Sequence, residues 1–415
     1  MRPPTPEVGL VSKAAYLSPE IAAAERSKLW PRVWLHAAAA DLVARPGQFV
    51  TVRLGGATEV LVIRGDDGEV RAFHNVCQHR GRRLVDDASG QLRTLRCPLH
   101  HWQWNLDGGL ARVPERASFG ALAEGDVRLP ALACASWNGQ VFVHLGQPEQ
   151  TLAEWLAPAT EALEPYDLAD YALVDQKTFE LPCNWKTVAD LFNEAYHVPA
   201  VHPYLLGSVD ETTVVTTLHG PHAEQTFELG RPGPHVSPTE VTEALEELLK
   251  SNGADPAKLE GDARRGPALL REALRARGLT ALSDAALTMG RSWFLFPSQT
   301  LNVYPMSAML HRHRPHPTDP ERTSFDQLTF TRIGAGEPRP TPRISTHARP
   351  SDEGDTGRVT EDDLAQVIAV QAGMRSPGFE GPRLGRHERA ILHMHATLDA
   401  YLATPPLQGG IPSGR

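Results

Sequence analysis

Four potential metal ligands lie in two short segments of this 415-residue chain. The first segment reads Cys77-Gln78-His79, the second reads Cys97-Pro98-Leu99-His100, and seventeen residues separate them. The thiolates and imidazoles can share one site only if both segments fold against each other, so this motif constrains the fold more than any other. Zinc accepts the set in tetrahedral geometry. A [2Fe–2S] cluster accepts it with both thiolates on one iron and both imidazoles on the other.

The flanking residues favour the cluster. Gly81 follows the first segment, Pro98 lies inside the second, and Trp102 and Asp107-Gly108-Gly109 follow downstream. These residues fit two loops that close over a cluster, because backbone N–H groups at glycine and proline turns can hydrogen-bond its sulfur atoms. A structural zinc site is the alternative.

This stretch resembles the Rieske domain of ring-hydroxylating oxygenases. The resemblance implies that Cys77, His79, Cys97 and His100 hold a Rieske [2Fe–2S] cluster. The loops lack the additional cysteine pair of high-potential Rieske proteins, so the resemblance is to the low-potential, oxygenase type. The family usually has glycine after the second histidine. This chain has His101, which we expect to change loop packing or solvent access without removing a ligand.

Composition restricts the class of protein. The length favours two or three domains. The net charge of −9, with no run of lysine and arginine, argues against nucleic acid as a partner. We find neither the apolar stretch of a signal peptide nor a run of roughly eighteen apolar residues, so we expect no membrane span. Cys134 and Cys183 are far apart and give no disulfide framework, which fits a cytoplasmic location.

The spacing of apolar residues divides the chain into two kinds of region. From Trp34 to about Gly146, short alternating runs predict a small antiparallel β domain. Its expected strands are 49–52, 60–63 and 140–144, with turns at 65–68 and 138–139. Elsewhere we expect helices at 18–30, at 152–163, from 185, within 236–285 and within 361–402, strands at 179–181, 294–296, 301–304 and 327–331, and a loop at 335–357.

A second group of metal-ligand side chains comprises Asp190, Glu194, His197 and His202. In a helix the first three, at i, i+4 and i+7, share one face. Pro199 is expected to end or kink that helix just after His197, so that the chain can bring His202 back beside it. Two imidazoles and one carboxylate leave positions open on Fe(II), which oxygen activation requires.

The pair of histidines alone is weak evidence for a metal. With the cluster motif and Asn184-Trp185-Lys186, it resembles the mononuclear-iron segment of the same family. The resemblance implies a third ligand in the C-terminal region, where many members read Glu-Asp, seven residues, then Gln-x-Gly. Counting back from Gln371 gives Asp363, with Asp362 in reserve and Glu361 beside it. The alternative is an acidic first turn, which the helix dipole favours.

Two further carboxylates receive roles from the resemblance. Glu194 matches the carboxylate that connects a Rieske histidine of one subunit to an iron-ligand histidine of the next. Glutamate there is a variation seen in carnitine and glycine-betaine type oxygenases, and a solvated helix carboxylate is the alternative. Asp190 lies where some members have asparagine near the iron, and we expect it to tune the site or to hydrogen-bond a ligand.

Other histidines are not expected to bind metal. The run His311-Arg312-His313-Arg314-Pro315-His316 alternates as a strand does, with histidines on one face and arginines on the other. His393 and His395 are expected on different sides of a helix, as surface or packing residues.

The resemblance covers nearly the whole chain and implies three parts. Residues 1–36 form an N-terminal helical segment that packs on the catalytic domain, 37–147 form the Rieske domain, and 148–415 form the catalytic domain. The implied fold is α+β: an antiparallel β Rieske domain and a helix-grip catalytic domain, in which an antiparallel sheet wraps around helices.

The implied function is that of the terminal oxygenase (α) component of a Rieske non-haem iron oxygenase, assembled as a homotrimer. Electrons from a separate reductase, with or without a ferredoxin, pass through the cluster to Fe(II) on His197, His202 and Asp363, where O2 is used to hydroxylate a substrate. A Rieske electron carrier without oxygenase activity and a zinc or iron hydrolase are the alternatives.

The sequence says less about the substrate. Leu191, Val198 and Phe294–Phe296 predict a partly apolar pocket, so we expect a small organic, aromatic molecule. Monohydroxylation, dihydroxylation and oxidative demethylation all use this apparatus, and the analogy at Glu194 favours monooxygenation.

Overall fold

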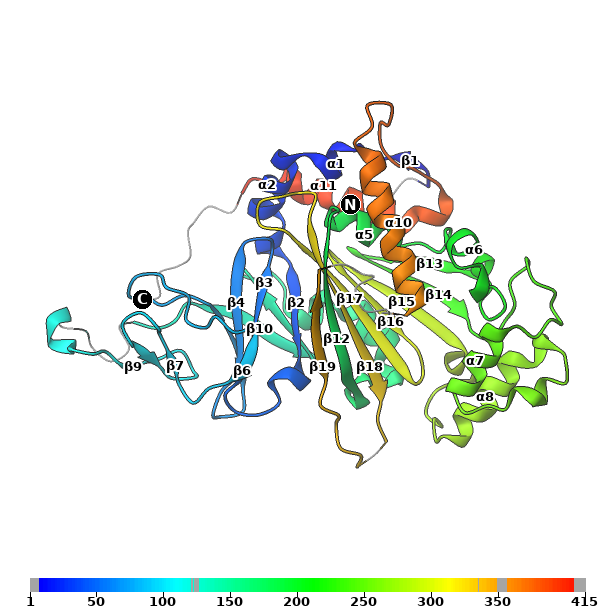
Figure 1. Cartoon of the computed structure of the whole chain (residues 1–415), viewed down its shortest axis with the longest axis horizontal. Coiled ribbons are helices and arrows are strands. Elements are labelled where there is room, and N and C mark those ends of the chain that lie inside the picture. Colours follow the sequence, from blue (N-terminus) through cyan, green and yellow to red (C-terminus); the bar gives the residue numbers. More distant parts are fainter. Residues whose placement is uncertain (1–6, 121, 123–126, 335, 349–356, 407–415) are drawn as a thin grey trace. The chain divides into compact units, whose positions relative to one another are not determined.

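The computed structural model describes residues 7–120, 122, 127–334, 336–348 and 357–406, and it divides the chain into two compact units (Figure 1). The small unit comprises Ala22–Ala157 with Arg314–Thr318 and the chain from Tyr401 onward. The large unit comprises Met1–Ile21, Pro158–His313 and Asp319–Ala400.

The small unit is built on a seven-stranded sheet with the strand order β2-β11-β10-β5-β4-β3-β6 and a three-stranded sheet with the order β7-β8-β9. Among the described residues, neighbouring strands in both sheets pair antiparallel. The strands are β2 (Trp34–Ala39), β3 (Gln48–Leu54), β4 (Thr58–Arg64), β5 (Val70–His74), β6 (Ser89–Gln91), β7 (Leu95–Arg96), β8 (Gln103–Trp104), β9 (Leu110–Arg112), β10 (Ala131–Trp137) and β11 (Gln140–His144). This unit also contains most of α2 (Pro19–Lys28) and all of α3 (Leu152–Trp155).

The large unit is built on an eight-stranded sheet with the order β13-β14-β15-β16-β17-β18-β12-β19. Its strands are β12 (Tyr171–Leu181), β13 (Val215–His219), β14 (His222–Glu228), β15 (Met289–Leu295), β16 (Gln299–Val303), β17 (Ser307–Pro315), β18 (Thr323–Arg332) and β19 (Arg343–His347). Its helices are α1 (Ala14–Leu17), α4 (Ala157–Leu163), α5 (Trp185–Leu191), α6 (Val198–Val201), α7 (Glu243–Ser251), α8 (Gly266–Ala276), α9 (Asp284–Leu287), α10 (Arg358–Met374) and α11 (Arg389–Ala403).

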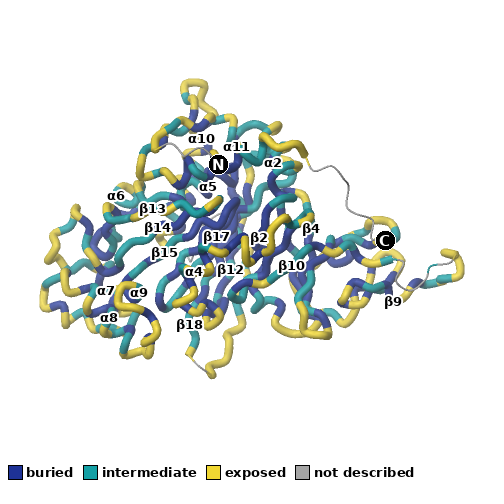
Figure 2. The backbone as a smooth tube through the Cα atoms, turned by 180° about the vertical axis from the view of Figure 1, so that it is seen from behind, coloured by how far each residue is buried: buried dark blue, intermediate teal, exposed yellow. Residues whose placement is uncertain are grey.

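Helices α5 and α10 cover one face of this sheet (Figure 1). Their apolar residues Val188, Leu364 and Val367 pack against Phe179 of β12 and Phe325 of β18. The buried residues of α10 recur at helical spacing, at 360, 363, 364, 367, 371 and 374, so one stripe of this helix faces the sheet. Figure 2 shows the strands of this sheet as largely buried, while exposed segments concentrate in the turns and around α7 and α8. The predicted α+β class is confirmed.

Three local expectations were wrong. The helix from Trp185 ends at Leu191 and does not continue through His197. Pro199 lies in the first turn of α6, where its missing N–H costs no helical hydrogen bond, and so it starts a helix instead of ending one. The region 335–357 contains β19, which pairs in parallel with β12; residues 335 and 349–356 of that region lie outside the described residues.

The N-terminal segment divides between the two units. Strand β1 (Gly9–Leu10) pairs with β20 (Arg383–Leu384), and Tyr16 is buried in an apolar cluster of the large unit. The end of α2 behaves differently, because Lys28 donates a hydrogen bond to the carbonyl of Leu402 inside the small unit. The expected segment 1–36 is therefore not one structural piece.

Candidate metal centres

The two cysteine loops repeat one backbone geometry. In the first loop the Cys77 N–H donates to the Arg82 carbonyl and the Gly81 N–H donates to the Cys77 carbonyl. In the second loop the Cys97 N–H donates to the Trp102 carbonyl and the His101 N–H donates to the Cys97 carbonyl. Each cysteine therefore heads a loop closed by bonds to residues four and five positions later.

The fourth residue after each cysteine has left-handed backbone geometry. Gly81 has φ 72° and His101 has φ 58°. This explains why glycine is usual after the second histidine, since only glycine adopts this geometry without a steric cost. His101 accepts the strain, and its Nδ1 lies 2.9 Å from Nη2 of Arg96.

A buried asparagine anchors the first loop. The Asn75 side-chain oxygen accepts the N–H groups of Leu84 and Val85, and its Nδ2 donates to the Val85 carbonyl at 2.7 Å. Cys77 and Cys97 are both about 1% exposed and belong to one apolar cluster. The loops are thus held by the core of the small unit.

The two proposed histidine ligands of the cluster are neighbours, and so are the two cysteines. The rings of His79 and His100 have centroids 4.6 Å apart, and Trp102 stacks on His79 at 4.8 Å. Nδ1 of His79 is buried without a hydrogen-bond partner in the described structure. Burial raises the pKa of the Cys77 thiol, and the adjacent Cys97 sulfur raises it further. Paired buried thiols and an unpartnered imidazole nitrogen fit a cationic metal centre, which stabilises thiolates.

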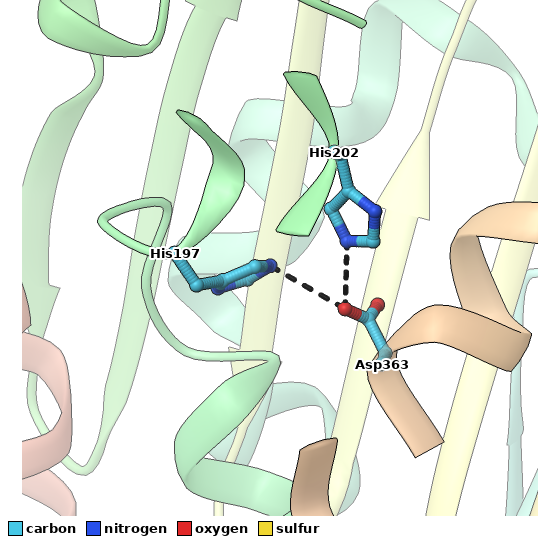
Figure 3. Close-up of side chains that lie close together, drawn as sticks. All are labelled: His197, His202 and Asp363. Atoms are coloured by element: carbon cyan, nitrogen blue, oxygen red, sulfur yellow. Dashed lines mark hydrogen bonds and ion pairs between the residues drawn. The ribbon is translucent and has the colours of Figure 1, made fainter. Parts of the chain in front are cut away.

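A second centre joins His197, His202 and Asp363 (Figure 3). One ligand atom from each of the three residues lies within 4.8 Å of the others. Oδ1 of Asp363 lies 2.7 Å from Nε2 of His202 and 3.4 Å from Nε2 of His197. His202 and Asp363 are only 1% and 3% exposed. A buried carboxylate that faces two imidazole nitrogens is a suitable donor set for a divalent metal ion.

Each imidazole of this centre has an acceptor on its other nitrogen. Nδ1 of His197 lies 2.6 Å from Oε1 of Glu194, whose Oε2 accepts the His197 backbone N–H. Nδ1 of His202 lies 3.1 Å from the Tyr204 hydroxyl, which donates to Asp362. Acceptors at Nδ1 hold the proton there, which leaves the Nε2 lone pairs to face the metal position.

Burial and charge oppose each other at His197. Burial lowers the pKa of its imidazole, but the hydrogen bond to Glu194 and the charges of Glu194 and Asp363 outweigh burial, so the pKa lies above its usual value. Without a metal ion, the site therefore favours the doubly protonated form of the His197 imidazole. A metal ion has to displace the proton on Nε2, while Nδ1 keeps its proton.

Glutamine 371 fixes α10 relative to α5. Its side-chain oxygen accepts the Asn184 backbone N–H at 3.0 Å and the Thr187 hydroxyl at 2.8 Å, and its amide donates to Glu321. Asn184 also caps α5, because its side chain accepts the Lys186 N–H. These bonds set the position of the helix that carries Asp363.

Asp190 is engaged away from the two histidines. Its carboxylate accepts the Tyr16 hydroxyl at 2.5 Å and lies 3.1 Å from Nε2 of His395. Nε2 of His395 also lies 3.0 Å from the Tyr16 hydroxyl. The contacts among Tyr16, Asp190 and His395 join α1, α5 and α11. Tyr16 and His395 were missed from the sequence, because they lie 174 and 205 positions from Asp190.

The excluded histidines are packing residues within the described structure. His311 and His313 lie on β17 beside the rings of Phe192 and Phe325. Burial lowers the pKa of each imidazole to about 3, so both are neutral at physiological pH. Arg312 between them pairs with the buried Asp326.

The metal-ligand residues form part of the wall of a cavity of about 500 Å³ inside the large unit. Leu191 and Val198 line it as expected, whereas Phe294 and Phe296 do not; they are 2% and 0% exposed, in the core. The apolar wall comes instead from leucines of α7 and α8, which the sequence reading missed. Glu194, Glu211 and His197 line this cavity and also a second, more superficial one of about 810 Å³.

Family profiles match both parts of the chain. Residues 33–133 match the profile described as "Rieske [2Fe-2S] domain", and residues 168–404 match "Ring hydroxylating alpha subunit (catalytic domain)". Both cysteine loops fall in the first range, and His197, His202 and Asp363 fall in the second. In the part of the chain that the structure describes, no helix is long and apolar enough to cross a membrane.

Curated relatives carry names of monooxygenase subunits. The glycine betaine monooxygenase oxygenase subunit of Pseudomonas aeruginosa is 34% identical over 205 residues, which are 49% of this chain and 46% of that protein. The chain thus spans about half the length of the relatives it matches at this identity. The carnitine monooxygenase oxygenase subunit of Escherichia coli is 26% identical over 387 residues, 90% of this chain and 88% of that protein.

Solved structures share the fold. A quaternary ammonium Rieske monooxygenase in complex with L-carnitine aligns with a TM-score of 0.70 at 20% identity, over 95% of this chain and 96% of that one. Naphthalene 1,2-dioxygenase from Rhodococcus sp. aligns with a TM-score of 0.66 at 19% identity, over 96% and 95%.

Proposed function

Because this chain belongs to the family of ring-hydroxylating α subunits, we propose that it is the terminal oxygenase component of a Rieske monooxygenase. In this proposal Cys77, His79, Cys97 and His100 hold the [2Fe–2S] cluster. His197, His202 and Asp363 hold the mononuclear iron. The observation that carries the proposal is the convergence of His197, His202 and Asp363 on the wall of a cavity of about 500 Å³, in a chain that also carries the cluster loops.

The protein residues perform defined tasks around the two centres. Glu194 and Tyr204 hold the protons on Nδ1 of His197 and His202, so that Nε2 of each ring can bind. Asp363 supplies the anionic ligand, and Gln371 positions its helix. Leucines of α7 and α8 give the cavity beside these ligands an apolar wall for the substrate. The bound iron supplies activation of O2 with electrons that arrive through the cluster.

Asp190 is proposed as a positioning residue. It acts through Tyr16 and His395, which tie the end of α5 to α1 and α11. Since Glu194 follows α5 within three residues of its end, movement of α5 would move this carboxylate and the His197 ring.

The relatives' names guide the choice of reaction. Two relatives are named as oxygenase subunits of a glycine betaine monooxygenase and a carnitine monooxygenase, and one of the similar structures holds L-carnitine. We therefore propose monooxygenation of a quaternary ammonium compound. The aromatic substrate and the dihydroxylation expected as possibilities from the sequence have only the fold-level likeness to a naphthalene dioxygenase in their favour.

The electron donor and assembly follow from the same resemblance. We propose a separate reductase as donor, with or without a ferredoxin, and a homotrimer in which Glu194 connects the iron site to the cluster of the next subunit. A hydrolase at the His197 site would leave the cluster loops without a task, and an electron carrier would not need the triad.

The experiment begins with the visible and EPR spectra of the purified protein, which should show a rhombic signal on reduction. The protein is then reconstituted with a surrogate reductase and assayed with a panel of quaternary ammonium and aromatic compounds. His202→Ala should keep the cluster spectrum and lose turnover, since it removes one of only two neutral nitrogen ligands. A colourless protein, or loss of the cluster signal in His202→Ala, would overturn the assignment of the two centres.

A further inference from the structure

The cavity beside His197, His202 and Asp363 is acidic, because a divalent metal ion there would displace the proton of His197 and offset only two of the carboxylate charges. Three carboxylates line it, those of Glu194, Glu211 and Asp363, and neither lysine nor arginine is among the described lining residues. His311 also lines it, but burial lowers the pKa of His311 to about 3, so this imidazole is neutral. The negative charge that remains favours a cationic ligand.

Glu211 is the carboxylate of the three that is not committed to the metal centre. Glu194 is bonded to His197, and Asp363 faces both histidines. The Glu211 side chain is only 6% exposed, and its Oε2 is buried with no hydrogen-bond donor in the described structure. Its Oε1 has one distant partner, Nε2 of the exposed His235 at 3.5 Å. A buried carboxylate with an unpaired oxygen is costly unless a cation approaches.

Aromatic rings share the cavity with this carboxylate. Phe227 and Tyr304 both line it and form an edge-to-face pair with centroids 6.5 Å apart. Aromatic faces attract alkylammonium groups, and an adjoining carboxylate adds to the attraction. The rest of the wall is apolar, with Leu248 of α7 and Leu270 and Leu274 of α8.

A substrate carboxylate would find neither lysine nor arginine among the described residues that line the cavity. The polar groups that remain are amides and hydroxyls, such as those of Asn302, Ser307 and Thr360. A buried carboxylate usually requires an arginine, lysine or several N–H donors. The names of the compared relatives specify betaine and carnitine, and both of these compounds are zwitterions.

Resting on the proposed function, we infer that the substrate is an organic monocation without a carboxylate. Its quaternary or tertiary ammonium group lies toward Glu211 and the Phe227–Tyr304 pair, and its apolar body lies against the leucines of α7 and α8. Glu211 is thus a specificity-determining residue, and the chain selects a hydrophobic ammonium compound instead of a zwitterionic one.

Calorimetric titration of the oxidised holoenzyme tests this without turnover. Choline and its neutral carbon isostere 3,3-dimethylbutan-1-ol have the same shape, so their comparison isolates the charge. We expect the neutral isostere to bind at least about tenfold more weakly. Glycine betaine should also bind more weakly than choline, and benzyltrimethylammonium should bind more tightly because its ring reaches the leucine wall. Equal affinity for choline and its isostere, or tighter binding of glycine betaine, would overturn the inference.

Variants locate the effect. Glu211→Gln should weaken choline binding about tenfold and leave the affinity for 3,3-dimethylbutan-1-ol unchanged. Glu240→Gln removes one negative charge from an exposed position of the same unit and should change neither affinity. An unchanged choline affinity in Glu211→Gln would remove Glu211 from the site, even if the wild-type ligand preference holds.

The two proposals fail separately. If the cation binds with this preference but no ammonium compound is oxidised by the reconstituted system, the proposed function fails and the cation site stands. If the system oxidises neutral aromatic compounds and choline does not bind, the cation site fails and the oxygenase assignment stands.

Discussion

At the residue scale, Asp362 and Asp363 are adjacent carboxylates with different surroundings. Asp363 is 3% exposed and faces Nε2 of both His197 and His202. The Asp362 side chain is 37% exposed and accepts the Tyr204 hydroxyl. The side chains of successive helical residues point about a quarter-turn apart, so only one of these two carboxylates can face His197 and His202. Asp362 and Asp363 are adjacent in the sequence, but the structure gives them different burial and different partners, and only Asp363 is placed to bind a metal ion.

Asp363→Ala is expected to lower the content of mononuclear iron far more than Asp362→Ala does. The first change removes one of three protein ligands. The second removes the acceptor of the Tyr204 hydroxyl and the ion pair with Arg358, but no metal ligand, and for such a supporting residue an effect of about 10-fold on metal affinity is typical. Iron per subunit is measured by metal analysis, with the cluster absorbance as an internal standard. Normal iron in Asp363→Ala together with loss in Asp362→Ala would move the ligand by one residue.

At the scale of elements, the two cysteine loops share their closure but differ in the residue at the left-handed position. An added Cβ on Gly81 would meet nothing within 4 Å, so substitution there costs backbone strain alone. His101 already bears that strain at φ 58° and gains the Arg96 contact in return.

Gly81→Ala should therefore destabilise the small unit by about 1 kcal/mol, and the temperature at which cluster absorbance is lost should fall by about 2–5 °C. His101→Gly should change that temperature little, because relief of strain offsets the lost Arg96 contact and the larger freedom of the unfolded chain. A large loss of stability in His101→Gly would mean that the ring, and not the backbone, holds the second loop.

The buried side-chain amide of Gln371 adds hydrogen bonds between helix α10 and the start of α5 to their apolar packing. Gln371→Leu would leave the Asn184 N–H and the Thr187 hydroxyl without their acceptor, at about 1–3 kcal/mol each. We expect lower thermal stability and a lower mononuclear iron content, with an unchanged cluster spectrum. Val370→Ala, at a neighbouring residue that is 47% exposed, serves as the control and should alter neither. Full iron content in Gln371→Leu would show that α10 keeps its position without this bond.

Local patterns in the sequence predicted those elements whose determinants are local. The Asn138-Gly139 turn adopts positive φ at both residues, as its hairpin requires, and β10 and β11 pair on either side of it. The α5 prediction failed where a local side-chain contact replaces helical bonding: Glu194 lies beyond the end of the helix and accepts hydrogen bonds from the backbone N–H and the ring of His197. Strand β19 was missed because its polar residues carry no alternating pattern, and only β12 beside it supplies the pairing.

The site was partly predictable for the same reason. Both pairs of ligands in the cysteine loops and the two iron-site histidines lie within short segments, so spacing was sufficient to name them. Asp363 lies 161 positions from His202, and only the resemblance could suggest it. Glu211 and the leucines of α7 and α8 carry no motif, and they gather only once the sheet and helices are in place.

At the scale of the whole molecule, Glu194 lies where two cavities meet. It lines the deep cavity of the triad and the superficial one, whose wall also includes Arg386, His387 and Arg389. Both of its oxygens are bonded to its own subunit's His197. A partner that enters the superficial cavity would reach this carboxylate without passing through the substrate space. In a head-to-tail ring, every subunit offers the same surface to the next, and such a contact closes only with rotational symmetry.

We therefore expect Glu194→Ala to separate metal binding from electron transfer. Three protein ligands and the complete cluster remain, so both metals should bind and the reductase should still reduce the cluster. Oxidation of the reduced cluster by O2 and substrate in a single turnover should slow severely, because the carboxylate link to His197 is gone. Glu194→Gln keeps the shape and loses the charge, so its rate should lie between the two, while Glu240→Gln should match the wild type. Stopped-flow absorbance measures the rate, and sedimentation gives the number of subunits. A wild-type rate in Glu194→Ala, or a fully active monomer, would rule out the bridging role, because neither is compatible with a path that runs through this carboxylate into a neighbouring subunit.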